Sequence, residues 1–365
     1  MHKQIGVGII GAGFMGRVHA RAARVAGGRL VGVADSVGPL AEALASDLGF
    51  GTVFQGSEDL IADPQVEVVH VCVPNHAHAR LVAEAIKAGK HVVCEKPLAT
   101  TADEARELEG LAAAAGVVAS VPFVYRYYPI VREIRERVRG GDGGRLSVLH
   151  GSYLQDWLAY ETDSDWRVDP LLGGASRAFG DIGVHWVDLV EFATAQRLTR
   201  VCAQLLTVFP TRQAKGGPVE VKTEDAVTLN FETDGGAIGS LVLSQVSFGR
   251  KNRIWFSLEG TKASFVFDHE MPDTLWIGGR SSSQVLARSA DGLHAGAARY
   301  VTVPAGHPQG YQDCFNAFVA DSYGAISGEV PDGLPRFADG RRAAELTEAV
   351  LASAARQAWV EVPCT

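Results

Sequence analysis

The sequence predicts an α/β protein in which a doubly wound parallel sheet is followed by an α+β domain with a large, mostly antiparallel open sheet. Two observations predict this arrangement. Short apolar runs alternate with amphipathic helical stretches from residue 4 to about 121, which is the pattern of βαβ units. Strand-like runs then dominate from residue 146 to 268. We therefore place one domain at residues 1–123 and a second at residues 124–365.

In the first domain, the expected strands and helices follow one another in βαβ order. The strands are expected at 5–10, 29–34, 66–73, 91–94 and 117–121, and the helices at 15–26, 39–48, 77–88 and 102–115. Thr101 precedes the last helix as a candidate N-cap, and Glu104 completes a capping box. The alternation implies a parallel sheet with helices on both faces.

In the second domain, helices are expected at 130–139 and 181–194. The expected strands are 146–154, 201–209, 221–232, 237–248, 254–259 and 263–268. Glycine-containing turns at 233–236 and at Gly260-Thr261 favour antiparallel neighbours. Two closing helices at 311–326 and 340–359 complete the fold, and the sequence leaves open whether they pack back on the first domain.

Composition narrows the class of protein. The length of 365 residues suits two domains, and the net charge of -8 argues against a nucleic-acid partner, which needs a basic face. The five cysteines are odd in number and widely spaced, without a C-x-x-C pair, so we expect reduced thiols and no metal site. No apolar run approaches the roughly 18 residues of a membrane span, and the first strand begins too early for a leader. These features predict a cytoplasmic protein with no membrane association.

A glycine-rich motif stands between the first expected strand and helix. Gly11, Gly13 and Gly16 form G-x-G-x-x-G, and Asp35 ends the second strand at the spacing of the dinucleotide fingerprint. The three glycines would permit the tight turn, the approach of a pyrophosphate and the packing of helix on strand, which is the signature of a Rossmann domain. A carboxylate at Asp35 can bind an adenosine ribose and repels a 2′-phosphate, and Ser36 follows where an arginine would favour NADP. NAD is therefore predicted over NADP, and a turn of no functional consequence is the alternative.

Two further clusters follow the next strands. Val73-Pro74-Asn75 comes after the fourth strand and Glu95-Lys96-Pro97 after the fifth, at the edge where open α/β sheets bind ligands. Lys96 could polarise a substrate oxygen or help to move a proton; the alternative is a surface ion pair with Glu95. The expected cofactor-binding residues are Gly11, Gly13, Phe14, Met15, Gly16, Asp35, Ser36, Val73, Pro74, Asn75, His78, Glu95 and Lys96.

The fourth cluster is an acid and a histidine on one helix. Asp181 and His185 stand at positions i and i+4, on one face of the helix near its N-terminus. Such a pair suits proton transfer during alcohol oxidation, because the hydroxyl proton must leave as hydride departs from carbon. It could also bind a metal, but no third ligand has a suitable spacing. A structural histidine is the remaining alternative.

Taken together, these motifs carry a family resemblance. GAGFMG, Asp35, VPNHAH, EKPLA, the Tyr125-Arg126-Tyr127 segment and GDIGVHWVD resemble the Gfo/Idh/MocA oxidoreductases, which include glucose-fructose oxidoreductase and inositol dehydrogenases. The resemblance implies that Lys96 is the catalytic lysine, that Asp181 orients the substrate and that His185 accepts the proton. It also implies homodimers or homotetramers formed through open sheet faces. One departure is Tyr127, where many members carry phenylalanine.

The segment 155–170 is the candidate substrate loop. Its aromatic side chains alternate with carboxylates, as binding of a pyranose ring requires. A solvated loop whose tryptophans plug an interface is an equal alternative, and the excess of acids hints at an amino sugar. The expected substrate-binding residues are Tyr125, Arg126, Tyr153, Gln155, Trp157, Trp166 and Arg167.

The sequence thus predicts an NAD-dependent dehydrogenase that oxidises a secondary ring hydroxyl of a sugar, glycoside, amino sugar or cyclitol. One alternative is an NAD-dependent glycosidase that acts by transient oxidation and elimination. The other is a non-catalytic dinucleotide sensor. Lys96, Asp181 and His185 together argue against the sensor, because a regulator needs no proton relay.

Overall fold

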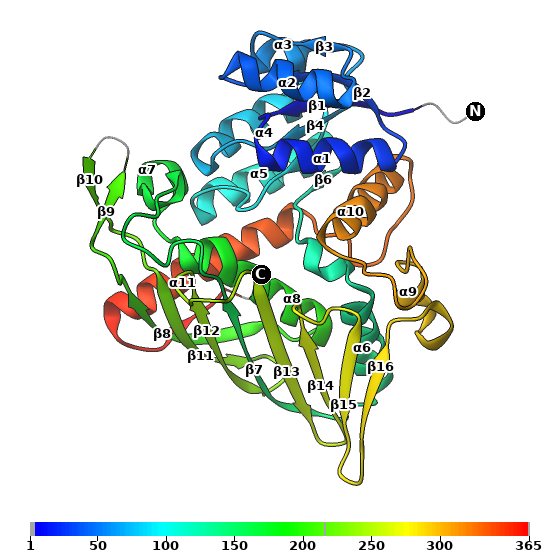
Figure 1. Cartoon of the computed structure of the whole chain (residues 1–365), viewed down its shortest axis with the longest axis vertical. Coiled ribbons are helices and arrows are strands. Elements are labelled where there is room, and N and C mark those ends of the chain that lie inside the picture. Colours follow the sequence, from blue (N-terminus) through cyan, green and yellow to red (C-terminus); the bar gives the residue numbers. More distant parts are fainter. Residues whose placement is uncertain (1–3, 215–216, 364–365) are drawn as a thin grey trace. The chain divides into compact units, whose positions relative to one another are not determined.

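The computed structural model describes residues 4–214 and 217–363, which form two compact units (Figure 1). The first unit comprises Met1–Val124 and Tyr311–Ala344, and the second comprises Tyr125–Gly310 and Glu345–Thr365. Each unit is described by itself below.

The first unit is built on a six-stranded parallel sheet with the order β3-β2-β1-β4-β5-β6. Its strands are β1 (Gly6–Ile10), β2 (Arg29–Ala34), β3 (Thr52–Val53), β4 (Val68–Val71), β5 (His91–Cys94) and β6 (Ala119–Ser120). Every residue of β1 and β4 is buried, as expected for a parallel sheet covered on both faces. The strand order reverses between β1 and β4, and open sheets bind ligands at the carboxyl ends beside such a point.

Helices connect these strands. They are α1 (Phe14–Val25), α2 (Gly38–Leu48), α3 (Ser57–Ala62), α4 (His78–Lys87) and α5 (Ala102–Ala115), with a 3₁₀ turn η1 (Asn75–Ala77) before α4. The capping box on α5 is confirmed, because Thr101 Oγ1 accepts the backbone N–H of Glu104 at 3.3 Å. The later helix α10 (Tyr311–Ile326) packs on α1, and α11 (Phe337–Arg356) begins in this unit.

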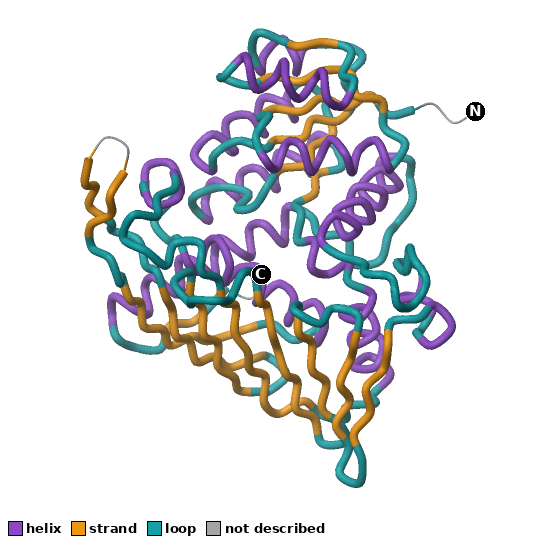
Figure 2. The backbone as a smooth tube through the Cα atoms, in the orientation of Figure 1, coloured by secondary structure: helices purple, strands orange, loops and turns teal. Residues whose placement is uncertain are grey.

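The second unit is dominated by a nine-stranded sheet with the order β16-β15-β14-β13-β7-β12-β11-β8-β17 (Figure 2). Within this sheet, the neighbouring strands β7 and β12 run parallel, and all other neighbouring pairs that the structure describes are antiparallel. The strands are β7 (Leu146–Leu154), β8 (Leu198–Leu206), β11 (Ala226–Thr233), β12 (Ile238–Ser244), β13 (Arg253–Gly260), β14 (Ser264–Asp268), β15 (Thr274–Gly278), β16 (Ser283–Ala287) and β17 (Val360–Glu361). Alternate residues of β11 are buried, so one face of the sheet is covered and the other is open.

The helices α6 (Pro129–Gly140) and α8 (Val184–Thr194) cover the buried face of this sheet. The short helices η2 (Val124–Tyr127), η3 (Trp166–Val168), α7 (Pro170–Gly173), η5 (Ala290–Gly292) and α9 (Ala295–Ala298) lie in the connecting segments. Trp186 of α8 donates through Nε1 to the Trp255 carbonyl at 2.8 Å, and it lies so close to Gly151 that a Cβ there would be 2.5 Å from Nε1. Gly151 therefore lets α8 pack on β7. A separate hairpin consists of β9 (Thr211–Ala214) and β10 (Gly217–Glu220).

The predicted fold class is confirmed, and most predicted elements are observed within a few residues. One correction concerns the helix expected at 181–194. Residues Phe179–Gly183 form a π-helical turn, η4, and the α-helix starts only at Val184, so Asp181 and His185 do not share one regular α-helix. The elements β3, α3, β9, β10, β15, β16 and β17 were not predicted.

Candidate active site

The glycine-rich loop has the geometry that a dinucleotide requires. Gly11 has a φ of 99°, and a Cβ there would lie 2.3 Å from the Cys72 carbonyl oxygen. A Cβ on Gly16 would lie 1.9 Å from the Gly11 carbonyl oxygen, so the turn and the start of α1 need both glycines. By contrast, a Cβ on Gly13 would meet no heavy atom within 4 Å. Gly13 therefore leaves space in front of the helix N-terminus, where a pyrophosphate fits.

Asp35 is tied to this loop. One carboxylate oxygen accepts the Ala12 N–H and the other accepts the Val37 N–H, both at 2.7 Å. The carboxylate is half-buried, and each oxygen retains lone pairs for a ribose hydroxyl. Phe14, which begins α1, is 73% exposed, and Ser36 is also exposed.

The remaining cofactor candidates lie at the same edge of the sheet. Val73, Pro74 and Asn75 follow β4, which is next to β1, and Glu95 and Lys96 follow β5, which is next to β4, so both groups stand at carboxyl ends of neighbouring parallel strands. The Lys96–Pro97 peptide bond is cis. Lys96 is half-buried, whereas the Glu95 carboxylate is turned inward and accepts from the Lys96 backbone N–H at 3.1 Å.

His78 does not present its ring to a ligand. The side chain is buried, with Nδ1 2.7 Å from the Pro97 carbonyl oxygen and Nε2 2.8 Å from the Val73 carbonyl oxygen. Burial lowers the pKa of His78, against the opposing effect of these two carbonyl groups. His78 therefore links the two loops after β4 and β5, in place of the direct cofactor contact expected from the sequence.

In the second unit, Asp181 is held by two side chains. One carboxylate oxygen accepts from Gln245 Nε2 at 2.8 Å, and the other lies 3.6 Å from Arg167 Nε. Arg167 also stacks on Trp166, with its guanidinium carbon 4.3 Å from the ring centre. Trp166 and Arg167, both predicted as substrate residues, thus adjoin the predicted catalytic acid.

His185 adjoins a second polar group. Its ring lies edge-to-face against Tyr125, with ring centres 5.1 Å apart. The hydroxyls of Tyr125 and Tyr153 are 2.7 Å apart, and Asn252 joins them: its Nδ2 donates to Tyr125 at 3.0 Å and its Oδ1 accepts from Tyr153 at 2.7 Å. We call Tyr125, Tyr153, Gln155 and Asn252 the hydroxyl–amide network, because Gln155 Nε2 also donates to Asn252 Oδ1 at 2.8 Å.

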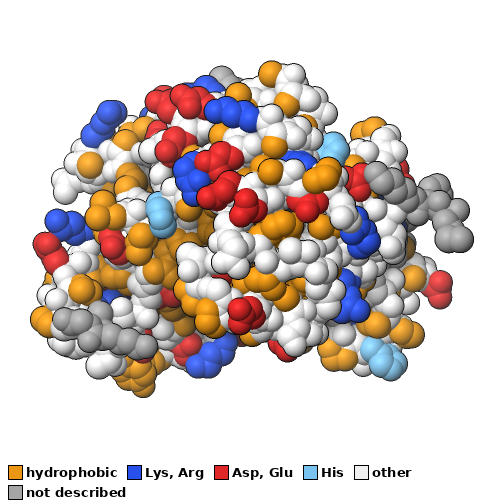
Figure 3. All heavy atoms as spheres, turned by 90° about the horizontal axis from the view of Figure 1, so that it is seen from above, with side chains coloured by type: hydrophobic (Ala, Val, Ile, Leu, Met, Phe, Trp, Pro, Cys, Tyr) orange, Lys and Arg blue, Asp and Glu red, His pale blue; other side chains and the backbone are white. Residues whose placement is uncertain are grey.

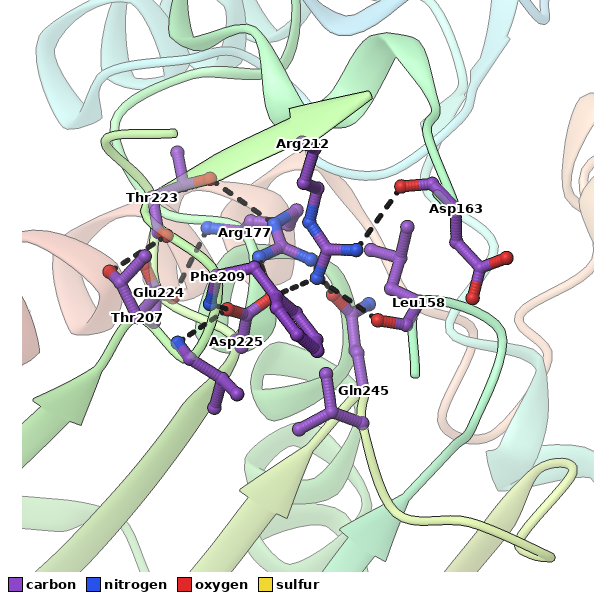
Figure 4. A network of polar contacts seen from close by, with 12 residues as sticks. Leu158, Asp163, Arg177, Thr207, Phe209, Arg212, Thr223, Glu224, Asp225 and Gln245 are labelled. Carbon is purple, nitrogen blue, oxygen red and sulfur yellow. Dashed lines mark hydrogen bonds and ion pairs between the residues drawn. The ribbon is translucent and has the colours of Figure 1, made fainter. Parts of the chain in front are cut away.

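A buried charge cluster, shown in Figure 4, is connected to Asp181 through Gln245. Arg177 and Arg212 both contact Asp225, and all three side chains are fully buried. Arg177 also donates to Gln245 Oε1 at 3.3 Å, so the cluster is connected to Asp181 through Gln245. The guanidinium of Arg212 donates to the carbonyl groups of Leu158, Tyr160 and Asp163. The candidate substrate loop is thereby anchored to the same cluster.

Comparison with known proteins identifies the chain. Residues 5–123 match the model of the oxidoreductase family GFO/IDH/MocA with an NAD-binding Rossmann fold, and residues 131–266 match the C-terminal domain of the same family. The chain belongs to the GFO/IDH/MocA family. The predictions of this family, of an oxidoreductase and of an NAD-binding Rossmann domain are confirmed.

Relatives in the GFO/IDH/MocA family extend over the whole chain. A levoglucosan dehydrogenase from Pseudarthrobacter phenanthrenivorans is 32% identical, over 99% of this chain and 99% of that protein. An inositol 2-dehydrogenase from Rubrobacter xylanophilus is 31% identical, over 67% of this chain and 66% of that protein. Among solved structures, a levoglucosan dehydrogenase in complex with NADH and levoglucosan superimposes with a TM-score of 0.93 at 30% identity, covering 100% of both chains.

Three features predicted for the substrate site have partners within the chain. Arg126 forms a buried, two-pronged ion pair with Asp188, so its guanidinium anchors α8. Trp157 donates to Gln155 at 2.8 Å and packs on a small core of Leu158, Val168 and Val221, which favours the packing role. Most acids of the loop already have partners within the chain. Asp156 pairs with Lys251 at 2.7 Å, Asp163 accepts from the Tyr160 N–H, Asp165 pairs with Arg167, and Asp169 caps α7. These contacts weaken the indication of a cationic substrate.

The sequence missed Asn252, Gln245, Arg177, Arg212 and Asp225. Asn252 contacts partners that are 97, 99 and 127 residues away in the chain, so no local spacing indicates it. The available signal of the charge cluster was Asp225, an acid within the strand expected at 221–232.

Within residues 4–214 and 217–363, no three His, Cys, Asp or Glu side chains are grouped as metal ligands would be. In the same described part, no helix has the length and apolarity needed to cross a membrane.

Cys72, Cys94, Cys202 and Cys314 are free thiols, and Cys364 lies outside the described residues. Lys and Arg side chains stand next to Asp and Glu side chains on the face shown in Figure 3.

Proposed function

We propose that this protein is an NAD-dependent dehydrogenase that oxidises a secondary ring hydroxyl of a neutral sugar or cyclitol. The observation that carries the proposal is the hydroxyl–amide network beside His185, in a chain whose other unit has a dinucleotide loop. Clustered hydroxyl and amide groups can both donate to and accept from the hydroxyls of a sugar. These groups therefore suit a polyhydroxylated, uncharged ring.

The cofactor would be held by the first unit. The Gly11–Gly16 loop would take the pyrophosphate at the N-terminus of α1, and Asp35 would take the adenosine ribose. When bound, NAD supplies the hydride acceptor. The half-buried Lys96, at the end of β5, would donate to the reacting oxygen, which would stabilise the alkoxide character that develops as the C–H bond breaks.

The second unit would supply the proton acceptor and the orientation of the ring. His185 would take the hydroxyl proton, and Asp181, fixed by Gln245 and Arg167, would orient the substrate. Because Arg167 already provides a positive charge beside Asp181, the carboxylate gives little net attraction for a cationic amino sugar. We therefore rank neutral rings first, in agreement with the levoglucosan and inositol named for the relatives.

The test is a panel of anhydrosugars, pyranosides, amino sugars and cyclitols assayed for NADH formation by absorbance. We expect the highest kcat/KM with a neutral ring and no release of reducing sugar. An NAD-dependent glycosidase would release reducing sugar from a glycoside without net NADH. A sensor would bind NAD and turn over none of the compounds.

Three further properties of the chain are proposals. Residues 1–123 would bind the cofactor and residues 124–365 would bind substrate and form the oligomer. The open face of the nine-stranded sheet exposes Val148, Val242 and Ile238 at 37, 47 and 59%, which suits a homodimer or homotetramer. Light scattering on the purified chain tests this, since a monomer would contradict it. The cytoplasmic location stays a prediction.

A further inference from the structure

Four side chains form an unbroken buried line within the first unit. Tyr323 on α10 lies with its hydroxyl 2.9 Å from His70 Nε2, and His70 Nδ1 lies 2.9 Å from His19 Nδ1. His19 Nε2 in turn lies 3.0 Å from Glu95 Oε1. The two histidines are 0% exposed, Tyr323 is 4% and Glu95 is 7%. The line ends at Glu95, the residue directly before Lys96. The proposed function assigns no role to Tyr323, His70 or His19.

Donor and acceptor counting gives this line a direction. A carboxylate only accepts, so His19 must donate through Nε2 to Glu95. A neutral His19 then accepts at Nδ1, which requires His70 to donate through its own Nδ1. His70 Nε2 is then an acceptor, and the Tyr323 hydroxyl donates to it. Every donor therefore points toward Glu95. In this arrangement all three hydrogen bonds have one donor and one acceptor, and Glu95 carries the single net charge of the four side chains.

We propose that Tyr323, His70 and His19 form a directed donor chain that holds Glu95 as a buried negative charge behind Lys96 and so sets the upper pH limit of activity. The inference rests on the proposed role of Lys96 as a cationic donor to the reacting oxygen. Tyr323, His70, His19 and Glu95 are positioning residues in this account. They act through Lys96.

The charges around Glu95 agree with this assignment. Burial alone would raise the pKa of Glu95, but the hydrogen bond from His19 and the positive charge of Lys96 oppose it, and the pKa is lowered. Burial, with His19 next to it, holds the pKa of His70 well below its usual range. The other titratable groups facing Glu95 are Cys72 and Cys94, whose thiol pKa values are raised well above the usual range by burial and by Glu95.

Removal of the charge itself has a definite consequence. In Tyr323→Phe, His70 Nε2 has no partner in either tautomer, so this change removes the first donor but does not reverse the line. Glu95→Gln removes the charge directly. It therefore takes a negative charge away from Lys96 and leaves the histidines in place.

The first test measures the tautomers and needs no activity. ¹⁵N-resolved NMR of the histidines in the full chain should show His70 protonated at Nδ1 and His19 protonated at Nε2. A wild-type His70 protonated at Nε2 would overturn the direction of the chain.

The second test measures kcat/KM against pH, with the best substrate of the panel, for wild type and Glu95→Gln. In the variant, the alkaline limb of the profile should move to lower pH by about one unit, which is a tenfold change in the acid dissociation constant that sets this limb. The acid limb should keep its position. Ser322→Ala is the matched control, because Ser322 is equally buried on α10 but bonds Ser120 and the Phe318 carbonyl instead. Its profile should match that of the wild type.

Two outcomes separate the inference from the proposed function. A profile of Glu95→Gln that superimposes on that of the wild type after scaling would show a purely structural role and overturn the inference. If no compound of the panel is oxidised, the proposed function fails. The tautomer measurement then decides alone whether the directed chain exists.

Discussion

The two units form their parts of the candidate site by different means. In the first unit, the site consists mainly of backbone: a glycine loop with space at Gly13, and loops at the carboxyl ends of neighbouring parallel strands. In the second unit, it consists of side chains, which reach Asp181 and the Tyr125–Tyr153 pair from distant parts of the chain. The first arrangement follows from topology and tolerates variation in side chains. The second depends on the identity of each residue.

This contrast predicts where substitutions act. In the glycine loop and at Asp35 of the first unit, they should change cofactor affinity and choice, whereas at Lys96 they should change turnover. In the second unit, they should change substrate turnover or the stability of the unit itself while NAD binding persists. The following predictions test that separation, starting with the largest effect.

Asp225→Asn should destabilise the second unit by about 3–5 kcal/mol, because it leaves Arg177 and Arg212 buried without their anion. Burial would raise the pKa of Asp225, but the ion pairs with the two arginines lower it. A lowered pKa in the folded state means that the contribution is complete above the unfolded value of about 3.9 and is lost as pH falls through the folded value.

Denaturant unfolding of Asp225→Asn between pH 3 and 7 should therefore show a deficit that shrinks with acidity below about pH 4. Asp291→Asn, at an exposed position in the same unit, is the control and should lie within about 0.5 kcal/mol of wild type. If the loss of unfolding free energy in Asp225→Asn were constant across this pH range, the charge of the Asp225 carboxylate would not be its cause.

Lys96→Met and His185→Ala should each lower kcat by at least about 10²-fold, because each removes a group that acts in the hydride-transfer step. NAD titration followed by fluorescence should give a nearly unchanged Kd for both variants. Unchanged turnover in either variant would exclude that residue from the mechanism. Loss of NAD binding in His185→Ala would contradict the separation of the two units' tasks.

The sequence was sufficient for the part of the site that follows from topology. Gly11, Gly16 and Asp35 identify themselves through spacing, because turn geometry and strand ends are local properties. Asp181 and His185 remain predicted site residues, and the sequence did not predict the π-turn that carries Asp181, where Gly183 packs closely against Phe179 and Leu243. The side-chain hydrogen bonds of Asn252 depend on partners from other strands and loops, so they arise only after the nine-stranded sheet has formed.

Asn252→Ala tests the hydroxyl–amide network. It removes three side-chain hydrogen bonds, to Tyr125, Tyr153 and Gln155, at about 1 kcal/mol each. We expect kcat/KM for the best sugar to fall by about tenfold or more, with KM and kcat both affected and NAD affinity unchanged. Asn230→Ala, an exposed asparagine on β11, is the matched control. A fall of the same size in the control would assign the effect to the sheet as a whole.

The smallest expected effect is a change in cofactor choice from Asp35→Ser combined with Ser36→Arg. Asp35 would repel the 2′-phosphate of NADP, and the exposed position 36 allows an arginine to bind it. The ratio of kcat/KM for NADP to that for NAD should rise by at least about tenfold, or 1.4 kcal/mol. Absolute activity should fall, because Asp35 also accepts the Ala12 N–H and the serine hydroxyl reaches less far. Ser36→Arg alone is the control: it adds the cation but retains the repelling carboxylate, so its ratio should change much less. A wild-type enzyme that already prefers NADP would refute the role of Asp35. A double variant that keeps its preference for NAD would show that cofactor choice, unlike the turn itself, depends on side chains outside the glycine loop.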